Sequence, residues 1–211
     1  MFQRYLDGQY RQPTGLIGRW IGAQMARQHQ PENQWTVELL DIQPTDTLLE
    51  VGFGPGFAIA KAAERAQQGV VAGVDFSQAM VKAARRRCAA ALRAGRVDLR
   101  LGDAARLPFA DNSFDKAFSI HSIYFWKEPA RALQEMHRVL KPEGMVIFTI
   151  LPRERWNEHD PNAPVGTPDC HAYSGDELSA LLLNAGFVQP RITADSQRQH
   201  RSNYSIIARK A

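Results

Sequence analysis

Short apolar runs alternate with longer amphipathic segments through the middle of the chain. The apolar runs have the length and composition of buried strands, and they lie at residues 47–51, 70–74, 97–101, 114–120 and 145–150. The longer segments have helical character, and they lie at residues 34–41, 58–67, 78–94 and 128–140. This alternation predicts an α/β fold, in which a mostly parallel, doubly wound sheet carries helices on both faces.

The two ends of the chain depart from this alternation. Near the start, Ile17, Ile21 and Met25 recur at near-helical spacing, which predicts an amphipathic helix. Residues 151–170 are rich in proline, and a long loop of this kind in a compact domain is more often functional than incidental.

The C-terminal part of the chain returns to regular structure. Residues 141–144 (KPEG) are predicted as a turn before the proline-rich loop, and residues 174–177 (SGDE) beyond it match a helix-capping box. Runs at 187–193 and 203–208 predict two last strands, which we expect to form an antiparallel pair at one edge of the sheet.

The length of 211 residues suits one well-buried domain. We divide this domain into an N-terminal helical lid of residues 1–42, a core of residues 43–150, and a C-terminal part of residues 151–211. The net charge of +4 would help an acidic partner approach but does not identify one. The polar start lacks the apolar core of a signal peptide, and no stretch approaches the roughly 18 apolar residues of a membrane span. These features predict a cytoplasmic protein.

The cysteine, histidine and arginine positions argue against several classes of site. Cys88 and Cys170 are too few for a disulfide framework, so reduced thiols are expected. The pairs His159-Asp160 and Cys170-His171 match no zinc spacing, so we predict no metal site. The run of residues 85–87 (RRR) lacks an aromatic platform, which favours a solvated helix face over contacts to phosphates. Nucleic acid is therefore not an expected partner.

A glycine-rich turn follows the first predicted strand. Gly52, Gly54 and Gly56 permit a tight turn and a close approach of a ligand to the backbone, and Glu50 lies two residues before the first glycine. The spacing is GxGxG, whereas a dinucleotide-binding loop has GxGxxG and would require glycine at position 57, which is Phe57. A tight turn without a ligand is the alternative.

Acidic residues also follow the next two strands. Asp75 directly follows residues 70–74, where an acid can accept hydrogen bonds from both ribose hydroxyls, although a helix cap is an alternative. Nicotinamide-dependent enzymes place an acid here, so Asp75 alone does not identify the class of enzyme. Asp103 lies after residues 97–101, where it could accept from an exocyclic amine such as that of adenine. In a doubly wound sheet, Glu50, Asp75 and Asp103 would point into one crevice.

A family resemblance becomes specific at this point. The motifs that carry it are LLEVGFGPG at residues 48–56, VDFSQAM at 74–80, GDAARLPF at 102–109, FD at 114–115 and RVLKPEG at 138–144. In this order they resemble the motifs of small-molecule class I S-adenosylmethionine-dependent methyltransferases, in the branch of the ubiquinone/menaquinone-biosynthesis enzymes. The resemblance covers roughly residues 36–150. It implies a Rossmann-like, seven-stranded sheet with the last strand antiparallel.

The resemblance implies S-adenosylmethionine as methyl donor, with S-adenosylhomocysteine as the product. It implies that the donor is bound by Glu50, Gly52, Phe53, Gly54, Gly56, Asp75, Phe76, Met80, Gly102, Asp103, Ala104, Ile120 and His121. Asp75 would bind the ribose hydroxyls with Phe76 against the adenine, and Asp103 would bind the adenine amine. Glu50 would hold the loop or the amino group, and His121 would border the methionine end. The sequence departs from its relatives at residues 124–125 (YF), where many of them carry two histidines.

Methyl transfer to a small-molecule acceptor mainly requires alignment of the nucleophile with the methyl group and exclusion of water. A base is needed only where the nucleophile must lose a proton, and the candidates are His121 and Tyr124. Candidates for lining the acceptor pocket are Trp20, Tyr124, Trp126 and Trp156, with an ordinary packing role as the alternative.

The methylated element (O, N, C or S) stays open, and we expect a monomer or a homodimer. Two rival functions also remain open: a nicotinamide-dependent oxidoreductase, and a non-catalytic protein that binds S-adenosylmethionine as a regulator.

Overall fold

The structure is a computed structural model that describes residues 30–159, 170–195 and 203–211. The predicted N-terminal amphipathic helix and Trp20 lie outside these residues, so the assignment of residues 1–42 as a lid stays a prediction. The chain divides into two compact units, one ending at Ala104 and the other beginning at Ala105, and each is described by itself.

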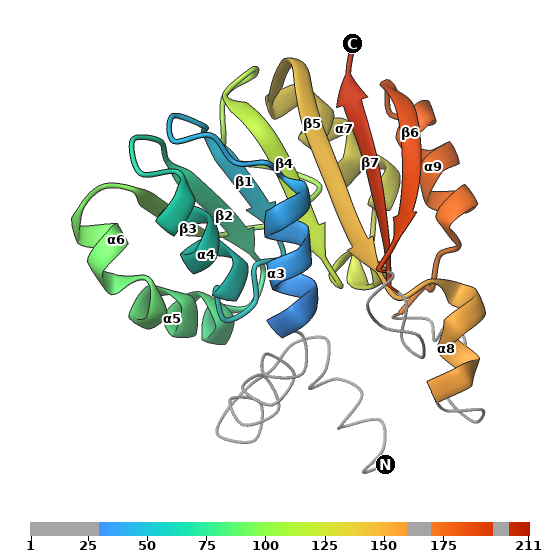
Figure 1. Ribbon diagram of the computed structural model, residues 1–211, viewed down its shortest axis with the longest axis horizontal. Coiled ribbons are helices and arrows are strands. Elements are labelled where there is room, and N and C mark those ends of the chain that lie inside the picture. Colours follow the sequence, from blue (N-terminus) through green and yellow to red (C-terminus); the bar gives the residue numbers. More distant parts are fainter. Residues whose placement is uncertain (1–29, 160–169, 196–202) are drawn as a thin grey trace. The chain divides into compact units, whose positions relative to one another are not determined.

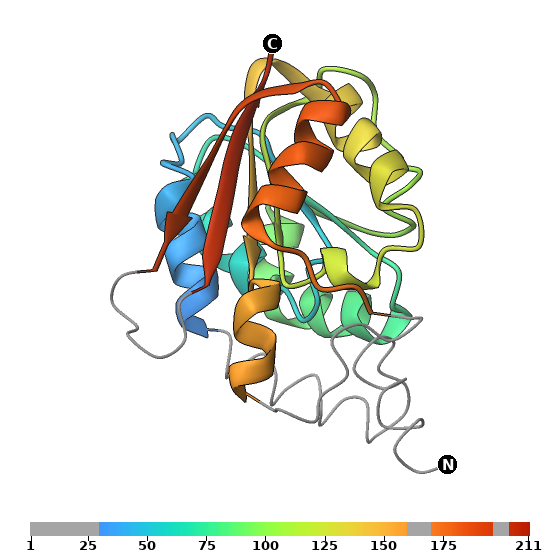
Figure 2. The same ribbon diagram turned by 90° about the vertical axis from the view of Figure 1, so that its right-hand side faces the viewer.

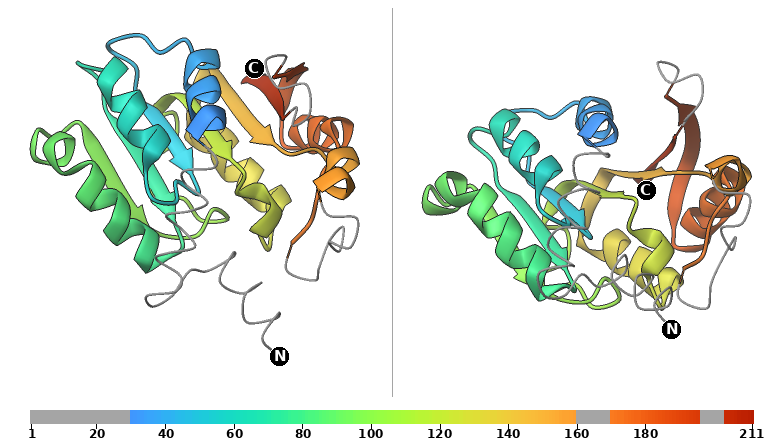
Figure 3. Two further views of the ribbon diagram at one scale, coloured as in Figure 1. Left: turned by 60° about the horizontal axis from the view of Figure 1, so that its bottom comes forward. Right: turned by 90° about the horizontal axis from the view of Figure 1, so that it is seen from below.

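Unit 1 contains three strands and four helices of the described chain (Figure 1). These are α3 (Gln30–Leu39), β1 (Leu48–Val51), α4 (Phe57–Arg65), β2 (Val71–Asp75), α5 (Gln78–Arg87), α6 (Ala89–Arg93) and β3 (Val97–Leu101). The strands are parallel in the order β3-β2-β1, with β1 and β2 buried along their whole length. Helices α3, α4 and α5 follow one another along this sheet (Figure 3).

Small side chains allow the helices of unit 1 to lie close to the strands. Helix α4 buries Ala58, Ile59 and Ala62. At Gly73 in β2, a Cβ atom would come within 2.5 Å of the Phe53 ring, so the strand requires glycine there. The chain therefore folds back tightly over β2, and this brings the glycine-rich turn against the strand that ends at Asp75.

Unit 2 contains four strands, three α-helices and one short 3-10 helix of the described chain. These are β4 (Phe114–Ile120), η1 (Ile123–Phe125), α7 (Pro129–Val139), β5 (Leu140–Ile150), α8 (Arg153–His159), α9 (Gly175–Asn184), β6 (Phe187–Ala194) and β7 (Tyr204–Lys210). Strands β4 and β5 are parallel, and β7 runs antiparallel to both β5 and β6. Figure 2 shows α9 against β6 and β7, with α7 beyond it.

The predicted fold class is confirmed. The strand order is β3-β2-β1-β4-β5-β7-β6, which is that of a seven-stranded, doubly wound Rossmann-like sheet with the last strand antiparallel. The predicted pair of C-terminal strands forms as expected. None of the described helices is both long enough and apolar enough to cross a membrane.

Three local predictions were wrong. The helix predicted at 78–94 is two helices, because the backbone at Cys88 (φ −93°, ψ 17°) leaves the helical region. The turn predicted at 141–144 lies inside β5. Leu140 already pairs with Phe114, and the next pair is Lys116 with Met145, so residues 141–144 form an irregularity within the strand. The loop predicted at 151–170 begins with helix α8, which follows Pro152, a residue that the first turn of a helix tolerates.

The capping box predicted at residues 174–177 is confirmed. The Glu177 amide donates to Ser174 Oγ over 3.0 Å, and the Ser174 amide donates to Glu177 Oε2 over 2.9 Å. Arg153, at the start of α8, forms an ion pair with the same carboxylate and donates to the carbonyl of Ala172. The pair joins the start of α8 to the start of α9.

Candidate functional site

The glycine loop, residues 52–56, connects β1 to α4 in unit 1. Gly52, Gly54 and Gly56 have φ values of 79°, 51° and 78°, a region that other residues rarely adopt. A Cβ atom at Gly54 would meet nothing within 4 Å, whereas one at Gly56 would lie 2.8 Å from Cβ of Ala84 on α5. Gly56 is thus needed for packing, and Gly54 faces open space where a ligand can approach the backbone.

Asp75 at the end of β2 holds the glycine loop in place. Its Oδ2 accepts a hydrogen bond of 2.8 Å from the amide of Gly54, and its Oδ1 accepts one of 2.8 Å from the amide of Ser77. The side chain is 6% exposed. Burial raises the pKa of Asp75 to about 6 against the opposing effect of the two amides. Each carboxylate oxygen has a lone pair left, which suits it to accept further hydrogen bonds from hydroxyl groups.

Glu50 in β1 is a further buried acid of unit 1. It is 2% exposed and accepts from the amide of Ile59 near the start of α4. Burial, with a further contribution from the nearby charge of Asp75, raises the pKa of Glu50 well above its ordinary value. Within the described part of the chain, its Oε2 has no hydrogen-bond partner. A buried acceptor of this kind suits a ligand that brings a donor or a positive charge.

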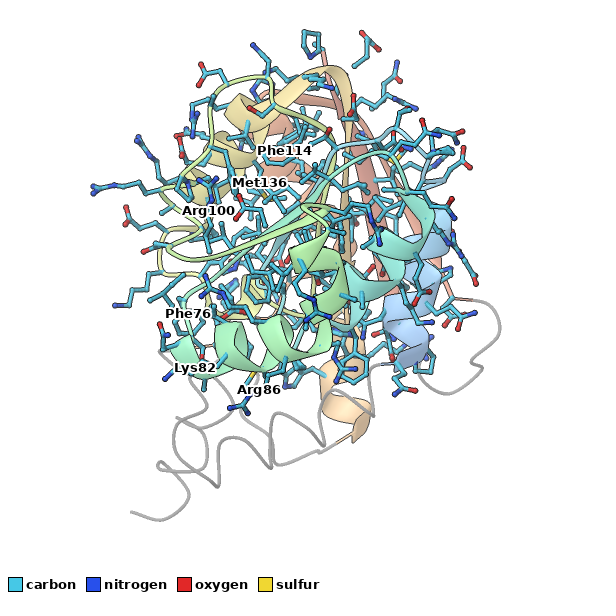
Figure 4. The ribbon with its side chains drawn as sticks, turned by 90° about the vertical axis from the view of Figure 1, so that its left-hand side faces the viewer. Phe76, Lys82, Arg86, Arg100, Phe114 and Met136 are labelled. Atoms are coloured by element: carbon cyan, nitrogen blue, oxygen red, sulfur yellow. The ribbon has the colours of Figure 1, made fainter. Side chains whose placement is uncertain are left out.

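Other predicted donor-binding residues of unit 1 lie at the ends of β2 and β3. Phe76 directly follows β2 and is 42% exposed. Figure 4 shows its side chain beside α5. Met80 is buried on α5, and its amide donates to Ser77 Oγ, the N-cap of that helix. Gly102 donates to the carbonyl of Asp75, and Asp103 beyond it is exposed. Glu50 and Asp75 are therefore buried together, whereas Asp103 lies at the surface.

The aromatic segment, residues 121–126, follows β4 in unit 2. His121 has a positive φ of 50°, and its amide donates to the carbonyl of Thr149 in β5. Its Nδ1 lies 3.1 Å from Tyr124 Oη, which also accepts a 2.5 Å hydrogen bond from the amide of Leu151. Burial raises the pKa of Tyr124, so its hydroxyl stays protonated at neutral pH. Tyr124 therefore carries its proton at neutral pH, and its candidacy as a base stays a prediction.

The predicted acceptor-side tryptophans of the described chain make packing contacts. Trp156 on α8 meets Tyr124 edge to face, with ring centroids 5.0 Å apart. Trp126 meets Phe148 at 5.8 Å and donates from Nε1 to Ser122 Oγ. These contacts fit the packing alternative and leave the pocket-lining role as a prediction. Among the described residues, no group of three or more His, Cys, Asp or Glu side chains could hold a metal ion.

The pattern of the sequence did not reveal two supports of the glycine loop. Ser77 fixes Asp75 through its backbone amide, which the sequence signals only as a helix N-cap. Arg87, predicted as part of a solvated face, donates from Nε to the carbonyl of Pro55 over 2.9 Å. The residues involved are 32 positions apart, so no local pattern predicts the contact.

Comparisons with known proteins agree with this geometry. The family model of the methyltransferase domain matches residues 49–148. The uncharacterised methyltransferase YdaC of Bacillus subtilis is 35% identical over 130 residues, which are 62% of this chain and 70% of that protein. The ubiquinone/menaquinone biosynthesis C-methyltransferase UbiE of Geotalea daltonii is 34% identical over 119 residues, or 54% of this chain and 49% of that protein. The chain thus spans about half the length of this relative.

A solved structure extends the likeness to almost the whole fold. An S-adenosylmethionine-dependent methyltransferase from Thermotoga maritima has a TM-score of 0.71 at 24% identity, covering 92% of this chain and 99% of that one. At this identity the likeness concerns the fold alone, while YdaC carries the family assignment. The chain belongs to the class I S-adenosylmethionine-dependent methyltransferases, and S-adenosylmethionine is the cofactor of that family.

Proposed function

We propose that this protein transfers the methyl group of S-adenosylmethionine to a small-molecule acceptor, mainly by positioning the two reactants. The observation that carries the proposal is the link between Asp75 and Gly54, which fixes a buried carboxylate against the amide of the glycine loop. Relatives named for ubiquinone, menaquinone and malonyl-carrier-protein methylation support a metabolic acceptor.

The residues of unit 1 fit the donor. Its ribose hydroxyls can donate to the remaining lone pairs of Asp75, and the open space at Gly54 allows backbone contact. The orphaned Oε2 of Glu50 offers an acceptor, directly or through water, for the methionine ammonium. A positive charge near Glu50 and Asp75 would favour their ionised forms, because it offsets the cost of burying two carboxylates together.

When bound, S-adenosylmethionine supplies a methyl group that is already activated by the positive charge of the sulfonium. The chain then needs to hold the donor, orient the acceptor and exclude water. In unit 1, the carboxylate of Asp75 and the glycine loop can hold the donor without changing conformation, because Gly54 and Ser77 already donate hydrogen bonds to Asp75. If the acceptor must lose a proton, His121 is the proposed base, because the hydroxyl of Tyr124 stays protonated.

The remaining assignments are extensions of the proposal. Ile120 and His121 at the methionine end, Asp103 at the adenine amine, and the tryptophans at the acceptor follow from the family resemblance. A cytoplasmic location, a monomer or homodimer, and the absence of a nucleic-acid partner stay predictions from the sequence.

Calorimetry with S-adenosylmethionine, S-adenosylhomocysteine and NADH tests the proposed donor. We expect S-adenosylmethionine and S-adenosylhomocysteine to bind and NADH not to bind, because Phe57 occupies the place of the third glycine of a dinucleotide loop. Tight binding of NADH alone would refute the proposal. Incubation with methyl-labelled donor and a metabolite extract then separates an enzyme from a regulator. Donor binding without transfer of label to any acceptor would favour the regulator.

A further inference from the structure

The arginine run of α5 does not form a uniform solvated face. Arg85 donates from Nη2 to the carbonyl of Leu99 in β3 over 3.1 Å. Arg87 donates from Nε to the carbonyl of Pro55, inside the glycine loop, over 2.9 Å. Arg86, between them, is exposed on the outer side of α5, as Figure 4 shows. Three consecutive arginines therefore have three different surroundings, and one of them reaches the glycine loop.

Arg87 also contacts the residue that directly follows the glycine loop. Its guanidinium carbon lies 3.3 Å from the centroid of the Phe57 ring, which is close enough for a cation–π interaction. Phe57 occupies the position where a dinucleotide loop would have its third glycine. The Phe57 ring thus has a role beyond occupying the position of a glycine. The guanidinium of Arg87 packs against this ring while it donates a hydrogen bond to the carbonyl of Pro55.

The contacts of Arg87 complete a set that holds the glycine loop from two sides. Asp75 accepts from the amide of Gly54 at the end of β2. On α5, Ala84 packs against Gly56, where a Cβ atom would come within 2.8 Å, and Arg87 binds the carbonyl between these two glycines. Without such contacts, a loop of three glycines has many conformations. A ligand that binds only one of them binds more weakly, because the loop must be ordered on binding.

We propose that Arg87 is a positioning residue for the methyl donor: with Phe57 it fixes the Pro55 carbonyl and so keeps the glycine loop in its binding conformation. This inference rests on the proposed function, because it assumes that the glycine loop binds S-adenosylmethionine. Arg87 acts through the loop backbone and need not touch the donor. Its loss therefore weakens donor binding and leaves the rate of transfer from bound donor unchanged.

The test is isothermal titration calorimetry of the full chain with S-adenosylhomocysteine. We expect Arg87→Ala to raise the dissociation constant about three- to tenfold, which is below the range for a buried charge-assisted hydrogen bond because this side chain is exposed. Arg85→Ala is the matched control, since it removes a guanidinium–carbonyl hydrogen bond from the same helix without touching the loop. Arg86→Ala controls for charge alone. Both controls are expected to stay within about twofold of wild type.

Phe57 provides a second test through a double-mutant cycle. If Arg87 and Phe57 act as one unit, Phe57→Leu by itself raises the dissociation constant. The double variant with Arg87→Ala then raises it by a smaller factor than the product of the two single-variant factors. Hydrogen exchange of the unliganded protein gives a readout that does not need the donor. Arg87→Ala should speed exchange of the amides of Gly54, Gly56 and Phe57 and leave those of β3 unchanged, whereas Arg85→Ala should not affect the loop.

The outcomes separate this inference from the proposed function. If wild type does not bind S-adenosylhomocysteine, the proposed function fails and the inference fails with it. If wild type binds, but Arg87→Ala and Arg85→Ala weaken binding equally, the effect is general destabilisation and only the inference is overturned. An unchanged constant in Arg87→Ala overturns it as well. If Arg87→Ala does not fold, Arg87→Lys takes its place, because lysine keeps the charge but lacks the planar Nε donor.

Discussion

The glycine loop and the aromatic segment both follow a parallel strand, yet they are held by different kinds of contact. In the glycine loop, side chains from elsewhere bind backbone atoms: Asp75 binds the amide of Gly54, and Arg87 binds the carbonyl of Pro55. In the aromatic segment, side chains bind one another, as Tyr124 does with His121, and Tyr124 Oη also takes up the amide of Leu151. The glycine loop therefore leaves backbone atoms open to a ligand, whereas polar side chains of the aromatic segment bind one another.

This difference has a functional consequence. A loop held through its backbone can be fixed in advance for the cofactor of the family, because none of its own side chains needs to change. A segment whose side chains contact one another can change its surface by substitution while the strand before it stays intact. We therefore expect substitutions in the glycine loop region to act on donor binding, and substitutions in the aromatic segment to act on stability and on the acceptor.

The largest effect is expected from Asp75→Ala. It removes the acceptor of the Gly54 amide and the proposed partner of the ribose hydroxyls, so donor binding should weaken by about 1.5–3 kcal/mol. Calorimetry with S-adenosylhomocysteine measures this directly. Asp98→Ala is the matched control, because Asp98 lies on β3 in an ion pair with Arg100 and is not proposed to bind the donor. An unchanged dissociation constant in a folded Asp75→Ala variant would contradict the ribose assignment.

A pair of glycine variants separates packing from ligand space within the glycine loop. Gly56→Ala places a Cβ atom 2.8 Å from Cβ of Ala84 at a φ of 78°, so we expect a loss of about 2–3 kcal/mol of unfolding free energy. Gly54→Ala meets no atom within 4 Å, so backbone strain alone should cost about 1 kcal/mol. Its methyl group would instead occupy the space proposed for the donor. Chemical denaturation and calorimetry together check the pair, and equal stability losses would refute the distinction.

Much of this loop was predictable from the sequence, because its parts obey local rules. A buried strand, three glycines and an acid after the next strand are all readable from spacing, and Glu50, Gly54 and Asp75 were identified in this way. The strand pattern predicted the antiparallel C-terminal pair, and the family motifs added the donor. The strand bounds agree to within a residue or two, except for the early start of β5.

The remaining features depend on contacts between distant residues, for which spacing gives no signal. Arg87 meets Pro55 from 32 positions away, and Tyr124 meets Leu151 from 27 positions away. The break between α5 and α6 at Cys88 is similar: its Sγ lies 3.8 Å from the carbonyl of Gly56, a tertiary contact inside an otherwise helical pattern. Helix α8 was missed because proline suggested a loop, although Pro152 lies just before the helix rather than inside it.

A smaller effect, on stability rather than on donor binding, is expected from Tyr124 in the aromatic segment. Tyr124→Phe leaves the part-buried amide of Leu151 without its acceptor, which should lower the unfolding free energy by about 1–2 kcal/mol. His121→Asn is the matched control, because asparagine tolerates the positive φ of 50° and keeps Tyr124 as acceptor of that amide. Donor binding should be unchanged in Tyr124→Phe, and the comparison with His121→Asn concerns stability only. A loss of donor affinity in Tyr124→Phe comparable to that in Asp75→Ala would remove the contrast between the two regions.

The smallest effect concerns pH, and it runs in opposite directions for stability and for binding. Burial raises the pKa of Asp75 from 3.8 to about 6, so folding favours the protonated form. The stability that this group contributes is complete below pH 3.8 and is lost as the pH rises through about 6. The ribose hydroxyls, in contrast, bind the carboxylate, so donor affinity should rise about tenfold between roughly pH 5 and pH 7.5.

Calorimetry at several pH values measures this rise, and Asp75→Asn should flatten it, because the amide does not titrate. Glu50 rises in pKa for the same reason, so Glu50→Gln is the second arm of the experiment. If the pH dependence persists in Asp75→Asn and disappears in Glu50→Gln, the proton that donor binding displaces comes from Glu50. The carboxylate that meets the donor's charge would then be the one in β1, and Asp75 would serve mainly to hold Gly54.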